Sequence, residues 1–281
     1  MSTVSHPGPV ILFEDVHIGF DEGEVLRGLS FQVAPRETKV LLGETGTGKT
    51  LTLKLAAGLL QPDAGRIVVL GRDLTRLGET ELLDFRRQVG FVFQEGALFD
   101  SLSVAENVAY RLREDRVDEE ETEGRVREAL RFVEMEDAIG KLPAELSGGM
   151  RRRVSIARAL VSRPPIVLYD SPTAGLDPVT SQTIITLLLR LRDAQGVTSL
   201  LATHRLQDAF ALANFRFDPR ANRVVPLHGN GQPAPREAGE APHALVPATT
   251  FLVLRDGKVY FEGDPRAILE SKDPYLKRFL L

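Results

Sequence analysis

Short apolar runs, separated by glycine-containing turns and amphipathic stretches, dominate the pattern of hydrophobic and polar positions along the chain. The apolar runs predict strands at 11–16, 29–33, 38–42, 65–70, 89–94, 166–169 and 199–203. The spacing of apolar residues predicts helices over 49–60 and 180–194. Strands that alternate with helices predict an α/β fold, in which a parallel sheet carries helices on both faces.

Three further segments have patterns of their own. Residues 103–163 are mainly helical in spacing, and the charged run 118–123 predicts a solvated helix face. Residues 218–249 are rich in glycine and proline, which predicts a flexible surface insertion with a strand near 223–227. Residues 251–261 predict a hairpin that turns at Asp256 and Gly257, followed by a short C-terminal helix.

Composition narrows the class of protein. The chain is 43% hydrophobic and 26% charged, which is ordinary for a globular protein, and it has no cysteine for disulfides or thiolate metal sites. Its net charge of −4 does not indicate nucleic acid as the main ligand. The apolar runs are shorter than the roughly 20 residues that cross a bilayer. The first ten residues lack the pattern of a secretory signal. We therefore expect a cytoplasmic protein that reaches a membrane only through a partner.

Residues 43–50 match the phosphate-loop pattern G-x-x-x-x-G-K-[ST] at each fixed position, between a predicted strand and a predicted helix. In such a loop, backbone N–H groups and the positive end of the helix converge on phosphate oxygens. Lys49 is expected on the β and γ phosphates, and the Thr50 hydroxyl on Mg²⁺. The predicted nucleotide-binding residues are Gly43, Glu44, Thr45, Gly46, Thr47, Gly48, Lys49 and Thr50.

Two other motifs carry chemistry that fits this loop. Asp170 ends the strand predicted at 166–169, and a carboxylate at that edge of a sheet can hold the Mg²⁺ shell. A plain strand-end aspartate is the alternative. Residues 146–150 read Leu-Ser-Gly-Gly-Met and open a predicted helix, which makes a second anion site at a helix N-terminus. A simple helix cap is the alternative there.

Together these motifs resemble those of the ATP-binding subunits of ABC transporters. The resemblance rests on residues 43–50, Gln94, 146–150, Asp170, 172–177 and His204, in the family's order. It covers residues 10–281 apart from the insertion at 218–249. It implies a P-loop NTPase fold of ABC ATPase type, with a RecA-like parallel-sheet core, an antiparallel β subdomain and a helical signature subdomain. In this single domain the helical subdomain spans about 96–160, and the remainder spans 10–95 and 160–281.

The resemblance also implies ATP and Mg²⁺ as cofactors and a second copy of the chain. Ser147, Gly148 and Gly149 then bind the γ-phosphate of ATP that the opposite subunit holds. Because one chain cannot fold this signature over its own distant phosphate loop, we expect a head-to-tail dimer. Asp177 resembles the residue that links the two sites across that dimer.

Three more positions take roles from the resemblance. Phe20 lies where the family places an aromatic ring that stacks on adenine, and a core phenylalanine is the alternative. Gln94 resembles a glutamine that senses Mg²⁺ and water, and a buried structural glutamine is its alternative. His204 resembles a histidine that contacts the γ-phosphate, and a core histidine is its alternative.

Ser171 departs from the family pattern. The usual glutamate at this position acts as the base, or orients the water, for attack on the γ-phosphate. A serine hydroxyl is shorter and cannot accept a proton at neutral pH without its own activator. We therefore expect ATP binding and dimer closure, with hydrolysis either slow or helped by another group, for which His204 is the candidate.

Residues 96–104, 146–153 and 273–280 resemble the Mla-type branch of the family. Those ATPases serve systems with an MCE-domain lipid-binding protein, which move phospholipids between the inner and outer membranes of diderm bacteria. The implied partners are an integral-membrane permease, the MCE-domain protein and, at the insertion, a small cytoplasmic regulatory subunit. The permease would hold the chain on the inner membrane. Residues 97–99 lie where the family receives the permease, unless they only anchor a loop.

Two other functions stay open. With Ser171, ATP could hold a dimer shut, so that the protein acts as a nucleotide-gated switch with little turnover. A relative that acts in DNA repair or translation is the third reading. Such relatives usually carry a long coiled-coil insertion or two ATPase cassettes, and these 281 residues contain neither. The acidic balance also argues against this reading, so we expect no nucleic-acid partner.

Overall fold

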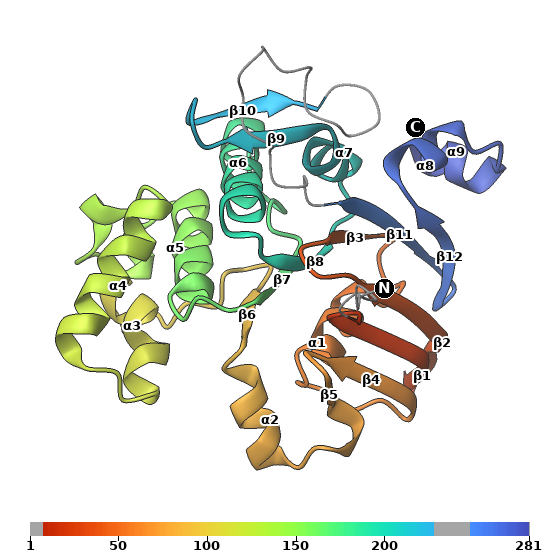
Figure 1. Ribbon diagram of the computed structural model, residues 1–281, viewed down its shortest axis with the longest axis horizontal. Helices are drawn as coiled ribbons and strands as arrows, with labels where there is room; N and C mark the ends of the chain where they lie inside the picture. Colours follow the sequence, from red (N-terminus) through yellow and green to blue (C-terminus); the bar gives the residue numbers. More distant parts are fainter. Residues whose placement is uncertain (1–7, 228–247, 281) are drawn as a thin grey trace, which may run out of the picture.

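The computed structural model describes residues 8–227 and 248–280. A central sheet in this part of the chain has the spatial order β12-β11-β3-β8-β7-β6 (Figure 1). Its strands are β3 (Thr38–Leu42), β6 (Val89–Val92), β7 (Ile166–Asp170), β8 (Thr198–Ala202), β11 (Thr249–Arg255) and β12 (Lys258–Gly263). All neighbours pair in parallel except β12, which runs antiparallel to β11. The predicted parallel sheet is therefore confirmed.

The sheet divides its apolar side chains between two cores, because successive residues of a strand point to opposite faces. In β7, Ile166 and Leu168 join one cluster with α1 (Lys49–Ala56), while Val167 and Tyr169 join another with α6 (Pro178–Gln195). Strands β3, β7 and β8 are buried along their whole length. Continuous apolar strands of this kind are typical of a parallel sheet covered on both sides.

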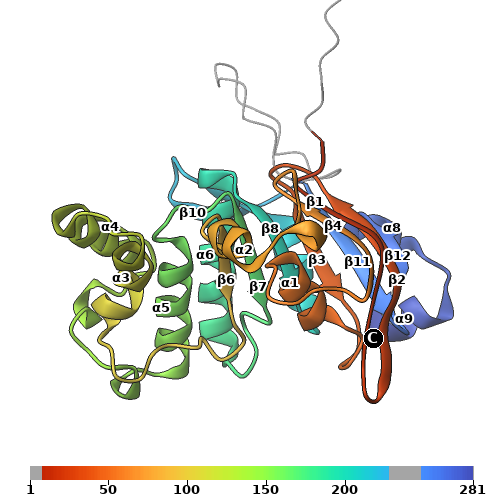
Figure 2. The same cartoon turned by 90° about the horizontal axis from the view of Figure 1, so that it is seen from below.

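A second, antiparallel sheet covers the face that carries α1 (Figure 2). Its order is β2-β1-β4-β5, with β1 (Ile11–Phe20), β2 (Gly23–Val33), β4 (Ala64–Val69) and β5 (Arg72–Asp73). The strands predicted at 11–16 and 29–33 were too short. Pairing between β1 and β2 runs from Ile11 opposite Val33 to Phe20 opposite Gly23, so cross-strand hydrogen bonds extend both strands through polar residues.

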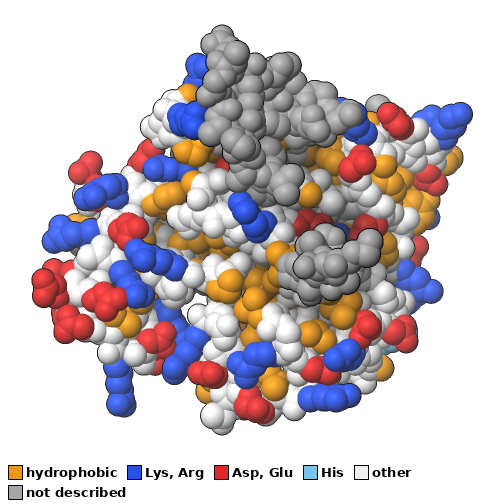
Figure 3. All heavy atoms as spheres, viewed as in Figure 1, with side chains coloured by type: hydrophobic (Ala, Val, Ile, Leu, Met, Phe, Trp, Pro, Cys, Tyr) orange, Lys and Arg blue, Asp and Glu red, His pale blue; other side chains and the backbone are white. Residues whose placement is uncertain are grey.

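A helical lobe stands beside the β6 edge of the central sheet (Figures 1 and 2). Its helices are α3 (Val104–Glu114), α4 (Glu119–Phe132) and α5 (Gly148–Leu160), and α2 (Glu79–Arg86) precedes β6. Short 3₁₀ turns occur at Leu74–Arg76, Glu136–Ala138 and Pro143–Glu145. Ser103 and Glu106 form a reciprocal capping box at the start of α3, which fixes where the lobe begins. Side chains of both charges are interspersed over this lobe (Figure 3).

The C-terminal third follows its predicted pattern in part. The hairpin at 251–261 is confirmed as β11 and β12, which turn at Asp256 and Gly257. The strand expected near 223–227 is β10 (Arg223–Pro226), and it pairs with β9 (Phe215–Asp218). Residues 228–247 of the expected insertion lie outside the described residues. The single predicted C-terminal helix is two helices, α8 (Pro265–Glu270) and α9 (Pro274–Leu280), because Asp273 caps a new start at Pro274.

A buried guanidinium group joins α6 to α7 (Leu206–Asn214) and β11. The Arg192 side chain is 2% exposed and donates to both carboxylate oxygens of Asp193, at 2.7 and 3.0 Å. It also donates to the carbonyls of Leu212 and Phe215 and, at 3.1 Å, to the hydroxyl of Thr249. The cation therefore donates to carbonyls at the end of α7, where the helix has no further N–H groups to offer, and the Leu212 carbonyl also accepts from the Thr249 hydroxyl at 3.2 Å.

We predict that Arg192→Met lowers the free energy of unfolding by about 3–5 kcal/mol, because it leaves the buried Asp193 carboxylate without its cation. Urea unfolding followed by circular dichroism measures the change. Arg113→Met is the control, since Arg113 pairs with Glu119 at the surface, where the side chains are 49% and 60% exposed. An exposed pair contributes about 0–1 kcal/mol. Equal losses in the two variants would contradict the prediction.

Candidate functional site

The phosphate loop lies between the end of β3 and the start of α1. Gly43 (φ 150°) and Gly48 (φ 97°) adopt backbone conformations that L side chains rarely reach, and a Cβ on Gly43 would approach the Leu254 carbonyl oxygen to 2.6 Å. The Lys49 ammonium group donates to the carbonyls of Gly43 and Glu44, at 2.8 and 2.7 Å. It therefore lies over the loop that is predicted to hold phosphate.

Burial lowers the pKa of Lys49, and the nearby Asp170 carboxylate opposes that shift. A dianionic or trianionic phosphate chain beside the ammonium group would stabilise its charged form in the same way as Asp170 does, and more strongly. The lysine is thus a half-buried cation, and this environment suits a phosphate ligand.

Hard oxygen donors meet at the end of β7. The Thr50 hydroxyl donates to Asp170 Oδ1 at 3.1 Å, and the Ser171 hydroxyl donates to the same oxygen at 3.4 Å. Asp170 is 5% exposed. Among the described residues no cluster of three or more His, Asp or Glu side chains could hold a metal ion. Thr50 and Asp170 fit Mg²⁺ because their oxygens lie together at the phosphate loop, and Mg²⁺ binds through few protein oxygens and completes its shell with phosphate and water.

One cleft of about 610 Å³ joins residues from five separate parts of the chain. It brings Gln94, Ser171 and His204 together with the phosphate loop and Phe20. Its full lining is Phe20, Val25, Thr45, Gly46, Gly48, Lys49, Thr50, Leu51, Lys54, Leu60, Gln94, Ser171 and His204. The titratable side chains in this lining are two lysines and a histidine, with no carboxylate. The cleft therefore attracts a polyphosphate.

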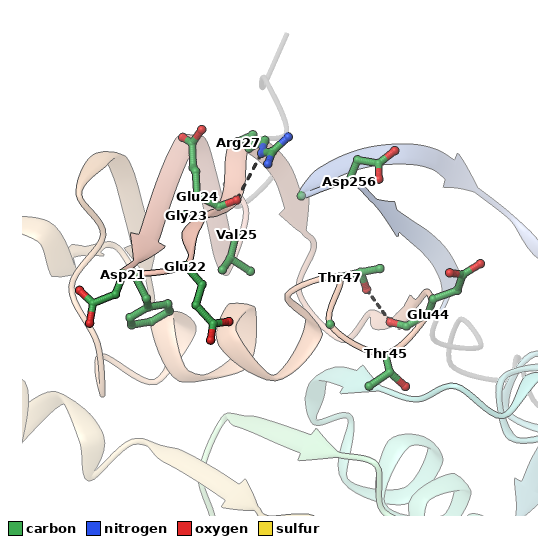
Figure 4. Close-up of a pocket in the computed structure, with 13 residues that line it drawn as sticks. Asp21, Glu22, Gly23, Glu24, Val25, Arg27, Glu44, Thr45, Thr47 and Asp256 are labelled. Carbon is green, nitrogen blue, oxygen red and sulfur yellow. Dashed lines mark hydrogen bonds between the residues drawn. The ribbon is translucent and has the colours of Figure 1, made fainter.

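An adjoining hollow of about 800 Å³ has the opposite charge. It lies between the β1–β2 turn, the phosphate loop and the β11–β12 turn (Figure 4). Its charged residues are Asp21, Glu22, Glu24, Arg27, Glu44 and Asp256. Both hollows share Phe20, Val25, Thr45 and Gly46. This separation of charge favours the predicted position of the phosphates at Lys49, away from the carboxylates.

Phe20, Gln94 and His204 lie at the surface of the cleft. Phe20 is 58% exposed at the end of β1, so it is not the core phenylalanine that we had kept as an alternative. Gln94 and His204 are also exposed, which removes the buried alternatives for them. All three side chains line the same cleft and are free to meet a ligand. Their individual roles stay predictions.

Ser171 has a strained backbone. Its φ of 47° is in the left-handed region, and its N–H donates to the Ala202 carbonyl at 2.8 Å. The residue is 8% exposed and its hydroxyl is directed to Asp170. A non-glycine residue costs about 1–3 kcal/mol in such a conformation, which persists only where the surroundings determine it. The turn therefore places residue 171 at the cleft although its side chain is short.

The signature residues do not reach this cleft. Ser147 caps α5 by accepting from the Met150 N–H at 3.2 Å, so the capping interpretation is correct for the isolated chain. A Cβ on Gly149 would approach the Thr180 methyl group to 2.3 Å, so α5 and α6 need a glycine there. In both views α5 is separated from α1 by β6 and β7 (Figures 1 and 2). Gly148 and Ser147 therefore need a partner other than their own phosphate loop.

Asp177 also lies outside the cleft. It caps α6 by accepting from the N–H groups of Val179 and Thr180, both at 3.0 Å. Hydrogen bonds from the Thr180 hydroxyl and from these N–H groups lower the pKa of Asp177. The carboxylate is thus held in place at the start of the helix, at the surface that also presents Gly148 against Leu176.

Sequence reasoning missed two residues that the structure places at this site. Lys54 lines the cleft one helical turn after Thr50, and spacing of four on a helix could have revealed it. Arg152 binds the carbonyls of Gln94 and Ser171. No local pattern signals that contact, since it joins residues from three distant segments.

Comparison with known proteins gives the family. The family model described as ABC transporter matches residues 26–174. The chain is 34% identical over 217 residues to the intermembrane phospholipid transport system ATP-binding protein MlaF of Haemophilus influenzae, covering 76% of this chain and 82% of that one. The chain belongs to the ABC transporter ATPases. The expected family and the ATP-hydrolysing class of enzyme are therefore confirmed.

Other ABC ATPases also resemble this chain in sequence and in structure. The methionine import ATP-binding protein MetN of Brucella abortus is 38% identical over 198 residues, which cover 70% of this chain and 54% of MetN. This chain therefore spans about half the length of MetN. A solved dimer of the ATP-binding cassette MJ0796 with ADP and Pi has a TM-score of 0.72 at 27% identity, covering 90% of this chain and 98% of that one. The P-loop NTPase fold of ABC type is confirmed.

In the part of this ABC ATPase that the structure describes, no helix combines the length and the apolar character that a membrane span requires.

We predict that Asp170→Asn lowers the Mg²⁺-dependent gain in ATP affinity about 10- to 100-fold, because the amide still accepts from Thr50 but no longer carries charge. Isothermal titration calorimetry with Mg²⁺ and with EDTA measures the gain. Affinity in EDTA should be unchanged or higher, since a carboxylate near the phosphates is lost. An equal loss under both conditions would mean that Asp170 acts on the fold and not on the metal.

Proposed function

We propose that this ABC ATPase powers a phospholipid transporter of the Mla type, between the two membranes of a diderm bacterium. The chain spans 82% of the length of MlaF, against 54% of the length of MetN. The observation that carries the energy-coupling role is the cleft that joins Lys49, Gln94, Ser171 and His204. The permease and the MCE-domain lipid-binding protein are its proposed partners, and the permease would hold it on the inner membrane.

We propose that ATP is bound between two copies of the chain, head to tail. The cleft supplies phosphate ligands from one copy, while Ser147, Gly148 and Gly149 lie apart from it at the start of α5. A helix of 13 residues that opens with two glycines offers free N–H groups to a phosphate. In a two-fold arrangement each signature then closes the partner's site, and Asp177 lies next to that contact.

In this arrangement the chain's own groups prepare γ-phosphate transfer to water. Lys49 neutralises the β and γ phosphates, Phe20 stacks on the base, and the acidic hollow keeps the phosphates at the lysine end. Mg²⁺ held by Thr50, Asp170 and Gln94 would offset charge on the phosphate oxygens. His204 and Gln94 orient the water, because the Ser171 hydroxyl already donates to Asp170. Hydrolysis is then possible but slower than with a carboxylate at residue 171.

Steady-state ATPase activity of the chain with its permease in lipid tests this proposal. We predict that Ser171→Glu is faster than wild type by at least about tenfold, since general base catalysis contributes about 10²- to 10⁴-fold. Lys49→Ala sets the background. Wild-type turnover above that background supports a motor. Wild-type turnover equal to that of Ser171→Glu would contradict the slow-enzyme proposal.

A second candidate function is an ATP-gated switch, and the carboxylate-free lining of the cleft favours it. Without a base, ATP would hold the dimer closed for long periods and thereby regulate the membrane complex. Wild-type activity at the Lys49→Ala background, restored by Ser171→Glu, would support the switch. The insertion at 218–249 is the proposed contact for a small regulatory subunit. Its deletion with no change in assembly or activity would dismiss that role.

The permease has a proposed docking groove of about 310 Å³, between α2, β6, α3 and α5. Two aromatic pairs line it, Phe99 with Tyr110 at 4.6 Å and Phe91 with Phe93 at 4.2 Å. Phe99 and Tyr110 are each 42% exposed. The lining also contains Arg86, Arg87, Arg111 and Arg158 and no carboxylate. Arg86, Arg87 and Arg111 are paired with carboxylates of this chain, so the exposed aromatic pair is the feature that fits an apolar segment of the permease.

We predict that Phe99→Ser together with Tyr110→Ser abolishes co-purification with the permease, because the pair supplies the exposed apolar surface of the groove. ATP affinity of the isolated chain should stay within about threefold of wild type. Leu269→Ser is the matched control, since Leu269 is 59% exposed on α8, at the opposite side of the molecule (Figure 1). Retained binding by the double variant would place the permease elsewhere.

A further inference from the structure

Arg152 is a buried cation that ties the signature helix to two strand ends. It lies in the second turn of α5, shortly after Ser147, and is 5% exposed. One terminal nitrogen, Nη1, donates to the Ser171 carbonyl at 3.0 Å, and the other, Nη2, donates to the Gln94 carbonyl. Within the described residues, both of its hydrogen bonds thus end on main-chain carbonyls and neither ends on a carboxylate.

Such a cation is costly to bury. Burial lowers the pKa of Arg152, and the more distant carboxylates of Asp170 and Glu95 only partly oppose this. A charge taken out of water without a paired anion is among the more destabilising features of a fold. If a fold keeps a buried cation of this kind, the charged side chain must provide a benefit that a neutral side chain would not.

The carbonyl that Arg152 binds belongs to the strained residue of the site. Ser171 has a φ of 47°, and its carbonyl accepts from Arg152 and from the Ala174 N–H, both at 3.0 Å. Its N–H is bound to the Ala202 carbonyl. The left-handed conformation is therefore determined from both sides of the residue, and Arg152 is the only side chain among these partners.

We propose that Arg152 is a positioning residue for ATP hydrolysis. It holds the carbonyls of Gln94 and Ser171 at a fixed separation. Gln94, which orients the water, thereby keeps its position relative to Asp170, whose carboxylate accepts from the Ser171 hydroxyl. Because Arg152 is on the helix that the signature opens, movement of α5 on dimer closure is transmitted directly to the catalytic edge. The inference rests on the roles proposed above for Gln94 and Ser171.

The chemistry of the side chain agrees with this role. A guanidinium group is planar and presents two Nη donors at a fixed spacing, so it can bridge two carbonyls. A lysine has one nitrogen, and a glutamine has one neutral amide on a shorter chain. Arg158 lies near the C-terminal end of α5 and binds the carbonyls of Gly96 and Ala97, of which Ala97 lines the docking groove. The helix therefore uses separate arginines for the catalytic edge and for the loop that follows Gln94.

Single-turnover ATP hydrolysis by the full chain, followed over hours, tests the proposal with Arg152→Lys and Arg152→Gln. We expect hydrolysis to slow about tenfold with Lys and up to about 100-fold with Gln, since displacements near 1 Å cost about that much. Affinity for fluorescent ATP should stay within about threefold of wild type. Arg153→Gln is the matched control and should hydrolyse at the wild-type rate, because Arg153 binds only carbonyls inside the helical lobe, of Val133 and Glu134.

Hydrogen exchange provides a readout that does not depend on turnover. In Arg152→Gln, amides 171–176 should exchange at least about tenfold faster, while those of α5 keep wild-type protection. If the wild type hydrolyses ATP no faster than Lys49→Ala, the chain does not hydrolyse ATP. Hydrogen exchange at 171–176 would then test the positioning role of Arg152 by itself. The proposal is overturned if both variants hydrolyse at the wild-type rate, if affinity falls in proportion to rate, or if exchange at 171–176 is unchanged.

Discussion

Hydrogen bonds between parallel strands hold the carboxyl ends of β3, β8, β7 and β6 at one edge of the central sheet. The phosphate loop, Gln94, Ser171 and His204 meet because of that register, while Phe20 and Val25 reach the cleft from the antiparallel sheet. The phosphate loop leaves β3, Ser171 follows β7, Gln94 follows β6 and His204 follows β8. Residues as far apart in sequence as Thr45 and His204, 159 positions, therefore line one hollow. Ligand sites outside the carboxyl ends of strands are the rule for open α/β sheets.

The two hollows at this edge differ in the charge of the side chains that line them. Lysines and a histidine line the phosphate end, while carboxylates line the hollow beyond Phe20. The same edge lacks the one carboxylate that would activate water, because residue 171 is a serine. In the function proposed here, this serine leaves a site that binds ATP well and cleaves it slowly. The proposed motor and the proposed switch therefore differ only in the rate of ATP hydrolysis at this cleft.

The helical lobe connects the ATP-binding cleft to the groove proposed for the membrane partner. Through Arg152 it contacts the catalytic edge, and through Arg158 and Phe99 it shapes the groove proposed for a membrane partner. Both contacts come from α5, which begins at the signature. A rigid helix that joins the signature to these two contacts can transmit a shift at one of them to the others, provided that the lobe moves as a body.

The sequence alone determined what depends on neighbours along the chain. Apolar runs bounded by glycine predicted β3 at 38–42 and the hairpin at 256–257, and fixed loop chemistry predicted Lys49 and Thr50 as phosphate and metal ligands. Tertiary structure decided the rest. Strand pairing made β1 and β2 longer than their apolar runs, and the fold left the Phe20 side chain exposed. The left-handed conformation of Ser171 and its hydrogen bond to Arg152 depend on segments that are far apart in sequence. Local patterns cannot encode such contacts, because their free energy exists only after the strands and helices have packed.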